Sequence, residues 1–188
     1  MKKADLRVSV AQARLLDAAL RVLARDGDAS PAAVAREAGV SKALIFHHFR
    51  SAEGLRDAMA QRVLAETQEG LSAFLRDYPN ARERLHALIH ALLAEPPEPP
   101  AATRNILRFW LESDGSGGAR GAARDALLVE FLRVTLKEMR WGGDATRVAS
   151  VLLARWHGAT AVYASGLPVD FEAEAARAVA EIEAMVDR

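Results

Sequence analysis

The segment SPAAVAREAGVSKALIFHHF, at residues 30–49, decides the fold of this 188-residue chain. Ser30 and Ser41 each precede a short run of helix-forming residues. A serine hydroxyl at that position accepts a hydrogen bond from the free amides of the first helical turn. Gly39 lies between the two runs, and glycine readily adopts the left-handed backbone of a tight turn. The segment therefore predicts two short helices joined in a helix-turn-helix.

The second of these helices has one face that packs against the rest of the protein and another that is free to contact a partner. Ile45 and Phe49 are four residues apart, so they share a face that should pack against Val34 and Ala35 of the first helix. The remaining surface is free to enter the major groove of DNA. The residues predicted to contact DNA are Ser30, Ser41, Lys42, Ala43, Leu44, Phe46, His47 and His48.

The side chains on this free surface suit the chemistry of a duplex. Lys42 can donate to a guanine edge or to a phosphate, and Ala43 and Leu44 can contact a thymine methyl group. His47 and His48 can donate to phosphate oxygens or to base edges. Together they indicate double-stranded DNA as the partner.

The charges are distributed unevenly along the chain. Overall, 25 Lys and Arg residues balance 25 Asp and Glu residues. Residues 1–50 carry nine basic and five acidic residues, a net charge of +4, so the remaining chain carries −4. Because neutralising phosphates releases counterions from DNA, this pattern favours the N-terminal end as the part that meets nucleic acid.

The sequence outside this segment predicts an all-α fold. Its apolar residues recur at spacings of three and four, and alternating β-branched runs are absent. A stiff spacer is expected at PPEPP, residues 96–100, and a loop at DGSGGARG, residues 114–121. The first five predicted helices cover about 8–26, 32–38, 42–49, 52–76 and 81–94. A sixth helix is expected to contain 106–111, and the last three cover about 122–140, 144–165 and 170 to the end.

The composition excludes several kinds of site. There is no cysteine, which excludes disulfides, thiolate metal sites and cysteine nucleophiles and suits a reducing cytoplasm.

The first residues lack the pattern of a secretory signal, and the longest charge-free stretch, 156–169, is too short to span a bilayer. We therefore expect a soluble, cytoplasmic protein without a membrane partner.

Three segments in order resemble the N-terminal signature of the TetR family of transcriptional regulators: RLLDAALRVLARDG at 14–27, the segment at 30–49, and SAEGL at 51–55. The resemblance implies a three-helix DNA-binding head and a larger helical body, usually of six helices. That body would bind a small molecule and dimerise through its last two helices. It implies a DNA-binding domain at 1–50 and a ligand-binding and dimerisation domain at 51–188.

This sequence departs from the family pattern at four positions. The family usually has tyrosine at Phe46, glycine at Ala43, lysine at Ala52 and an aromatic residue at Asp28. Three of these changes remove or weaken contacts with the DNA backbone. We therefore expect weaker or more salt-sensitive DNA binding than is usual for the family.

The body contains candidate ligand contacts, implied by the resemblance and by the aromatic and polar residues present. They are His86, His90, Phe109, Trp110, Arg155 and Trp156, with His157 as an alternative to Arg155. No metal, cofactor or catalytic residue is predicted. One alternative remains, a helical metal-binding protein or enzyme using Glu83, His86 and His90, which share a helix face.

The last two helices carry more apolar residues than a two-helix tail needs. A two-fold dimer through these helices is the expected use. The predicted interface residues are Val151, Ala159, Val162, Phe171, Val179, Ile182 and Val186. The sequence thus predicts a homodimeric repressor that responds to an unidentified small-molecule effector and binds a palindromic operator. A helical adaptor that has lost DNA binding is the other alternative.

Overall fold

The computed structural model describes residues 3–96, 98–111 and 119–187 of the chain. Within these ranges every regular element is an α-helix, which confirms the predicted all-α fold. In chain order the helices are α1 (Lys3–Asp26), α2 (Pro31–Ala38), α3 (Lys42–Phe49), α4 (Ala52–Asp77), α5 (Ala81–Leu92), α6 (Pro100–Leu111), α7 (Ala119–Glu138), α8 (Ala145–Ala164) and α9 (Phe171–Val186). None of these helices is both long enough and apolar enough to cross a membrane.

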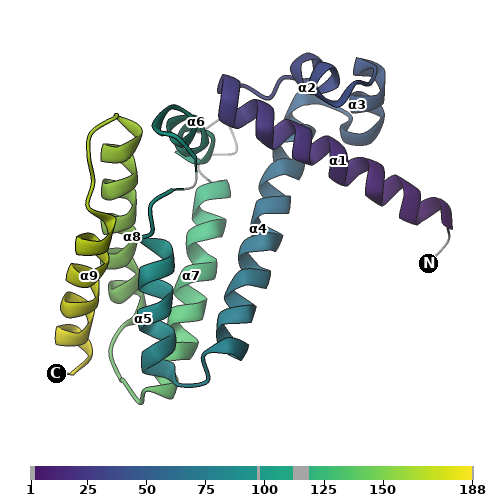
Figure 1. Ribbon diagram of the computed structural model, residues 1–188. Helices are drawn as coiled ribbons and strands as arrows, with labels where there is room; N and C mark the ends of the chain where they lie inside the picture. Colours follow the sequence, from purple (N-terminus) through teal and green to yellow (C-terminus); the bar gives the residue numbers. More distant parts are fainter. Residues whose placement is uncertain (1–2, 97, 112–118, 188) are drawn as a thin grey trace.

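Helices α1, α2 and α3 form a head at one end of the molecule, and α4 leads from it into the body (Figure 1). Buried apolar side chains hold the head together. They include Leu15, Leu16, Ala19 and Leu23 of α1, Val34 and Ala35 of α2, Ile45 and Phe49 of α3, and Leu55 and Met59 of α4. The first turns of α4 are therefore packed into the core of the head.

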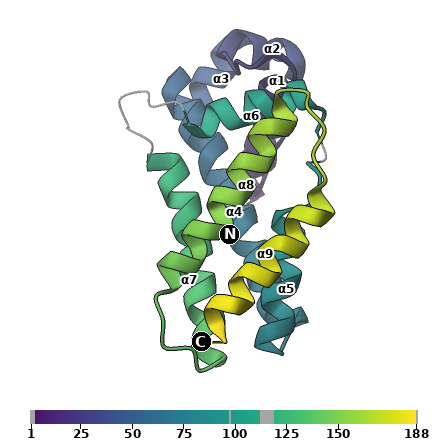
Figure 2. The same cartoon turned by 90° about the vertical axis from the view of Figure 1, so that its left-hand side faces the viewer.

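Helices α5, α7, α8 and α9 form the body around a second apolar core. Figure 2 looks onto α8 and α9, which pack against each other on one side of the body. The core residues include Leu85 and Ile89 of α5, Leu132 and Leu136 of α7, Val148 and Leu152 of α8, and Ala178 and Ile182 of α9. Helix α6 lies between the two parts, where it packs on both α1 and α8.

Several helix ends differ from the sequence-based expectation. Helix α1 begins at Lys3, five residues before the expected start, because its backbone continues beyond the apolar stripe that identified the helix. Helix α6 begins at Pro100, the last residue of the expected spacer, where proline suits the first helical turn. Helix α7 begins at Ala119, within the expected loop. The rest of that loop, 114–118, lies outside the described residues.

Candidate DNA-binding surface and ligand cavity

Both helices of the helix-turn-helix are capped as the sequence predicts. The backbone N–H of Ala33 donates to Ser30 Oγ at 3.4 Å, and that of Leu44 donates to Ser41 Oγ at 3.2 Å. Between the helices, Gly39 has φ +66° and ψ +33°, and its N–H donates to the carbonyl of Arg36. This left-handed residue sets the angle at which α3 leaves α2.

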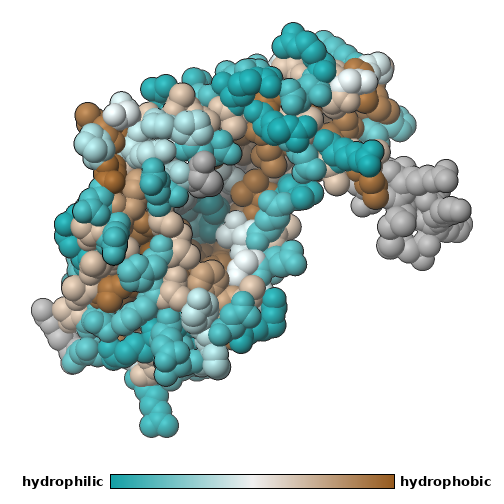
Figure 3. All heavy atoms as spheres, viewed as in Figure 1, coloured by the Kyte–Doolittle hydropathy of each residue, from teal (hydrophilic) through white to brown (hydrophobic). Residues whose placement is uncertain are grey.

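Helix α3 is anchored by one face and open on the other. Ile45 and Phe49 are buried in the core of the head. Lys42, Ala43 and His47 are exposed and His48 is half-buried, while Leu44 and Phe46 expose 36% and 38% of their surfaces. Figure 3 shows apolar patches among the polar surface of the head. An exposed mixture of cationic, aromatic and apolar side chains suits the edges of bases in a groove.

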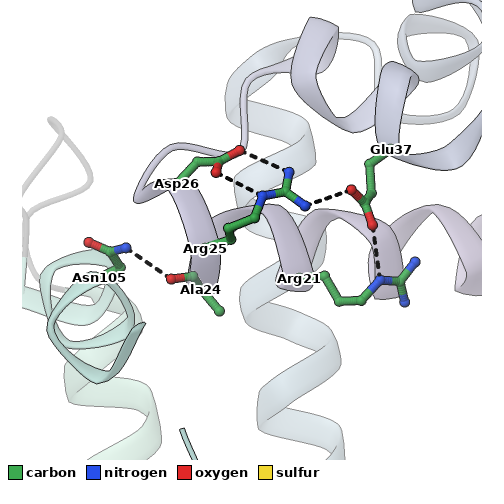
Figure 4. Close-up of polar contacts among 6 residues, drawn as sticks. All are labelled: Arg21, Ala24, Arg25, Asp26, Glu37 and Asn105. Atoms are coloured by element: carbon green, nitrogen blue, oxygen red, sulfur yellow. Dashed lines mark hydrogen bonds and ion pairs between the residues drawn. The ribbon is translucent and has the colours of Figure 1, made fainter. Parts of the chain in front are cut away.

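Ion pairs join α2 to α1 (Figure 4). Glu37 accepts hydrogen bonds from Arg25 Nη1 at 2.9 Å and from Arg21 Nε at 3.2 Å, and Arg25 also pairs with Asp26. The hydrogen bond from Arg25, with that from Arg21, holds the pKa of Glu37 below its ordinary value. The carboxylate therefore stays ionised and keeps both arginines in place at neutral pH.

Helix α6 joins the head to the body. Asn105 Nδ2 donates to the backbone carbonyl of Ala24 at 2.9 Å, as Figure 4 shows. From the same helix, Phe109 and Trp110 are buried in the core of the head, with Ile106 packed beside them. The position of α6 is thus tied to the end of α1.

A cavity of about 440 Å³ opens on the other side of α6. Figure 3 shows the molecule hollowed between α4 and the neighbouring helices of the body. The wall is mostly apolar, and its size falls in the range of small-molecule sites. The lining residues are Val63 of α4, Ala91 and Leu92 of α5, Ala94, Glu95, Pro96 and Glu98 of the following segment, Thr103, Ile106, Leu107 and Trp110 of α6, Arg124 of α7, and Trp156 and Thr160 of α8.

Arg124 is the cation of this wall. Its guanidinium carbon lies 5.2 Å from the ring centre of Trp110 and 4.5 Å from that of Trp156. Nη2 lies 3.0 Å from Asp125 Oδ1 and 3.1 Å from His157 Nε2. Burial lowers the pKa of His157, and the charge of Arg124 lowers it further. A neutral His157 can then accept a hydrogen bond from the guanidinium.

Comparison with known proteins assigns this architecture. Residues 15–59 match the family model described as "Bacterial regulatory proteins, tetR family". The chain is 32% identical over 109 residues to the HTH-type transcriptional regulator BetI of Escherichia coli (strain K12 / DH10B), a match that covers 56% of each protein. The helix-turn-helix region, residues 15–59, is thus similar to the TetR family. It spans about half the length of the curated relatives that it matches.

Solved structures of other proteins share this fold over most of the chain. Reduced NemR of E. coli superposes with a TM-score of 0.71 at 23% identity, covering 93% of this chain and 97% of that one. FadR of Bacillus halodurans, named as a fatty acid degradation regulator, gives a TM-score of 0.69 at 16% identity, covering 89% and 95%. At these identities the likeness shows the fold, with an N-terminal helix-turn-helix and a helical body.

The candidate ligand residues are dispersed over the molecule. Trp110 and Trp156 line the cavity, whereas Phe109 is buried in the core of the head. Arg155 lies outside the cavity, where it pairs with Glu174 and Glu181. Sequence reasoning missed the rest of the wall, including its cation Arg124 and the polar Thr160.

The two histidines of α5 also lie away from the cavity. His86 Nε2 is 2.9 Å from Glu183 Oε1 on α9, and Arg82 pairs with the same carboxylate. His90 is exposed. Within the described part of the chain, no group of three His, Asp, Glu or Cys side chains lies close enough together to hold a metal ion. Glu83, His86 and His90 are therefore not such a group. The alternative of a metal centre on α5 therefore has no support in the geometry.

The predicted interface residues differ in what they can offer a second copy. Val162 is exposed, and Val151, Val179 and Val186 are half-buried. Ala159 and Phe171 retain little exposure. Ile182 needs correction, because it has 0% exposure within its own chain, in the core of the body. It supports α9 from beneath and has no surface with which to touch a partner.

Proposed function

We propose that the protein is a transcriptional regulator, specifically a ligand-responsive repressor that binds a palindromic operator as a homodimer. The observation that carries this proposal is the open face of α3, anchored by Ile45 and Phe49 and presenting Lys42 and His47 outward. That arrangement suits insertion into the major groove. Residues 1–50, together with the packed first turns of α4, would act as the reading head, and 51–188 as the sensing and dimerising part.

The exposed side chains of α3 and the two capping serines each have a role in this proposal. Lys42, in the first turn of α3, would donate to a guanine or a phosphate, and Ala43 and Leu44 would contact thymine methyl groups. Phe46, His47 and His48 would lie along the groove wall. Ser30 and Ser41 cap their helices with their oxygens, and their hydroxyl hydrogens remain able to donate to phosphates.

Dimerisation would set the spacing of two such heads. The exposed Val162 and the half-buried Val151 lie on α8, and Val179 lies on the adjacent α9. Two copies of this helix pair would form a four-helix interface with two-fold symmetry. A two-fold dimer reads a palindrome, with half-sites about one helical turn apart.

The ligand response would pass through α6. One side of this helix lines the cavity with Thr103 and Ile106, and Asn105 holds the end of α1. A ligand that fits the cavity better when α6 is displaced would therefore reposition the head. Operator affinity would then fall by as much as the ligand prefers the displaced state.

The test is selection of bound fragments from genomic DNA, followed by titration of the winning duplexes. We expect a palindrome, and Lys42→Ala should weaken binding and reduce the salt dependence by about one counterion. The matched control is Lys137→Ala, which changes an exposed lysine on α7. This variant should bind the selected duplexes like the parent protein. Purified protein that ignores every duplex at low ionic strength would contradict the proposal and would favour the adaptor alternative.

A further inference from the structure

Thr160 carries a hydroxyl that the protein leaves without a partner. The residue is 5% exposed, and its Oγ1 is buried with no hydrogen bond to any described residue. Ser150 in the same helix and Ser165 at its C-cap satisfy their hydroxyls by donating to the carbonyls of Thr146 and Ala161. A buried polar group without a partner is costly, so it needs an explanation. Thr160 lines the cavity, so a molecule bound there can supply the missing partner.

Arg124 has a second unused donor on the same wall. Its Nε and Nη2 are engaged by Asp125 and His157, while Nη1 makes no hydrogen bond within the described part of the chain. The two tryptophans fix the plane of the guanidinium. A rigid guanidinium loses little freedom when it binds, and its geometry matches a carboxylate.

The other lining residues indicate what the remainder of the ligand is like. Val63, Leu92, Ile106 and Leu107 come from three helices and give an apolar wall. The acidic lining residues Glu95 and Glu98 are exposed, so water screens their charges, whereas Arg124 is largely enclosed. Asp125 offsets part of the charge of Arg124 but does not line the cavity, so the enclosed charged group that faces a ligand is the guanidinium.

We propose that this cavity binds an amphipathic carboxylic acid, with its carboxylate on Arg124 Nη1 and the Thr160 hydroxyl and its alkyl or aryl body against α4, α5 and α6. This assignment deepens the proposed function, since it names the chemical class of the effector. The binding itself requires no DNA, so it can be tested independently of regulation.

Isothermal titration of the full chain with four probes of similar length tests the head group. Decanoate should bind at least about tenfold more tightly than decan-1-ol or decanamide, because only the carboxylate forms an ion pair with the guanidinium. Decyltrimethylammonium should bind most weakly, because its charge opposes Arg124. Tightest binding of the cation, equal binding of acid and alcohol, or no binding of decanoate at millimolar concentration would each overturn the proposal.

Two variants assign the contacts. Arg124→Met should abolish the preference for decanoate over decan-1-ol, whereas Arg133→Met, an exposed arginine on the same helix, should preserve it. Thr160→Val keeps the shape and removes the hydroxyl, so decanoate affinity should fall about tenfold. Thr146→Val, an exposed threonine on α8, is its control.

Thr160→Val also distinguishes a ligand contact from a structural role. Removing an unpaired buried hydroxyl should leave the Tm of the ligand-free protein unchanged or higher, while binding weakens. A lowered Tm with unchanged affinity would overturn the proposal, and this variant carries the test if Arg124→Met does not fold. If decanoate binds as expected but leaves operator affinity unchanged, the ligand class stands and the proposed regulatory response fails.

Discussion

The side-chain amide of Asn105 on α6 donates a hydrogen bond to the backbone carbonyl of Ala24 on α1, with an N···O distance of 2.9 Å (Figure 4). The bond is formed next to Ile106, which lines the cavity. Any shift of α6 that accompanies ligand binding must therefore either move the end of α1 or break this bond. In the proposed ligand response, this contact would link the cavity to the head.

Asn105→Asp is expected to weaken that link. The carboxylate has the size of the amide but cannot donate to the carbonyl of Ala24, so about 1 kcal/mol of contact is lost. The ratio of operator affinities without and with ligand should fall about fivefold, while ligand affinity measured without DNA changes little. Arg104→Gln, an exposed neighbour on α6, is the control. An unchanged ratio in gel-shift titrations would show that the signal takes another route.

Phe46→Tyr should tighten DNA binding. The ring is 38% exposed, so a hydroxyl can be added without steric conflict. It would supply the phosphate contact that the family usually makes at this position. We expect a gain of about fivefold in operator affinity, corresponding to one additional hydrogen bond. Operator affinity is measured by titration at several salt concentrations. In that measurement Tyr78→Phe, which removes a hydroxyl at the far end of α4, should have no effect.

Gly39→Ala and Gly70→Ala should change stability in opposite directions. A Cβ at either position meets nothing within 4 Å, so steric conflict is absent from both. Gly39 has φ +66°, where alanine costs about 1 kcal/mol. Gly70 lies in the interior of α4, where alanine gains up to about 1 kcal/mol. Chemical denaturation measures both, and equal shifts of the midpoint would refute the backbone explanation.

Acidification should destabilise the protein through His157. Burial and the charge of Arg124 lower its pKa from the ordinary value of 6.5. The unfolded chain therefore binds a proton at a higher pH than the folded chain does, so stability falls as the pH drops below about 6.5 and levels off below the folded pKa. His157→Gln keeps an acceptor for Arg124 and cannot titrate in this range. Its Tm should fall less than that of the parent between about pH 7 and about pH 5. Parallel Tm profiles would disprove this role of His157.

Much of the architecture was predictable because local signals coincide with it. The capping serines, Gly39 and the pair Ile45 and Phe49 define the helix-turn-helix without reference to the rest of the chain. The start of α7 at Ala119 was missed, since the glycine-rich composition favours a loop and the helix there depends on its tertiary surroundings.

The cavity was less predictable because its wall combines five helices. Arg124 looks like any surface arginine in its own helix, and only packing brings it between Trp110 and Trp156. Thr160 left a usable signal, because it is a polar residue one turn from both Trp156 and the buried Ala164. A lone hydroxyl on an otherwise apolar stripe marks a position to examine for a ligand.

The two indole rings that enclose Arg124 have a practical consequence. They are two of the three tryptophans in the chain, and the third, Trp141, lies beyond α7 beside a different recess. Indole emission depends on nearby charge and water, so a molecule entering between α6 and α8 should alter most of the intrinsic fluorescence signal. The protein thus carries its own optical reporter, and effectors can be screened without attaching a dye.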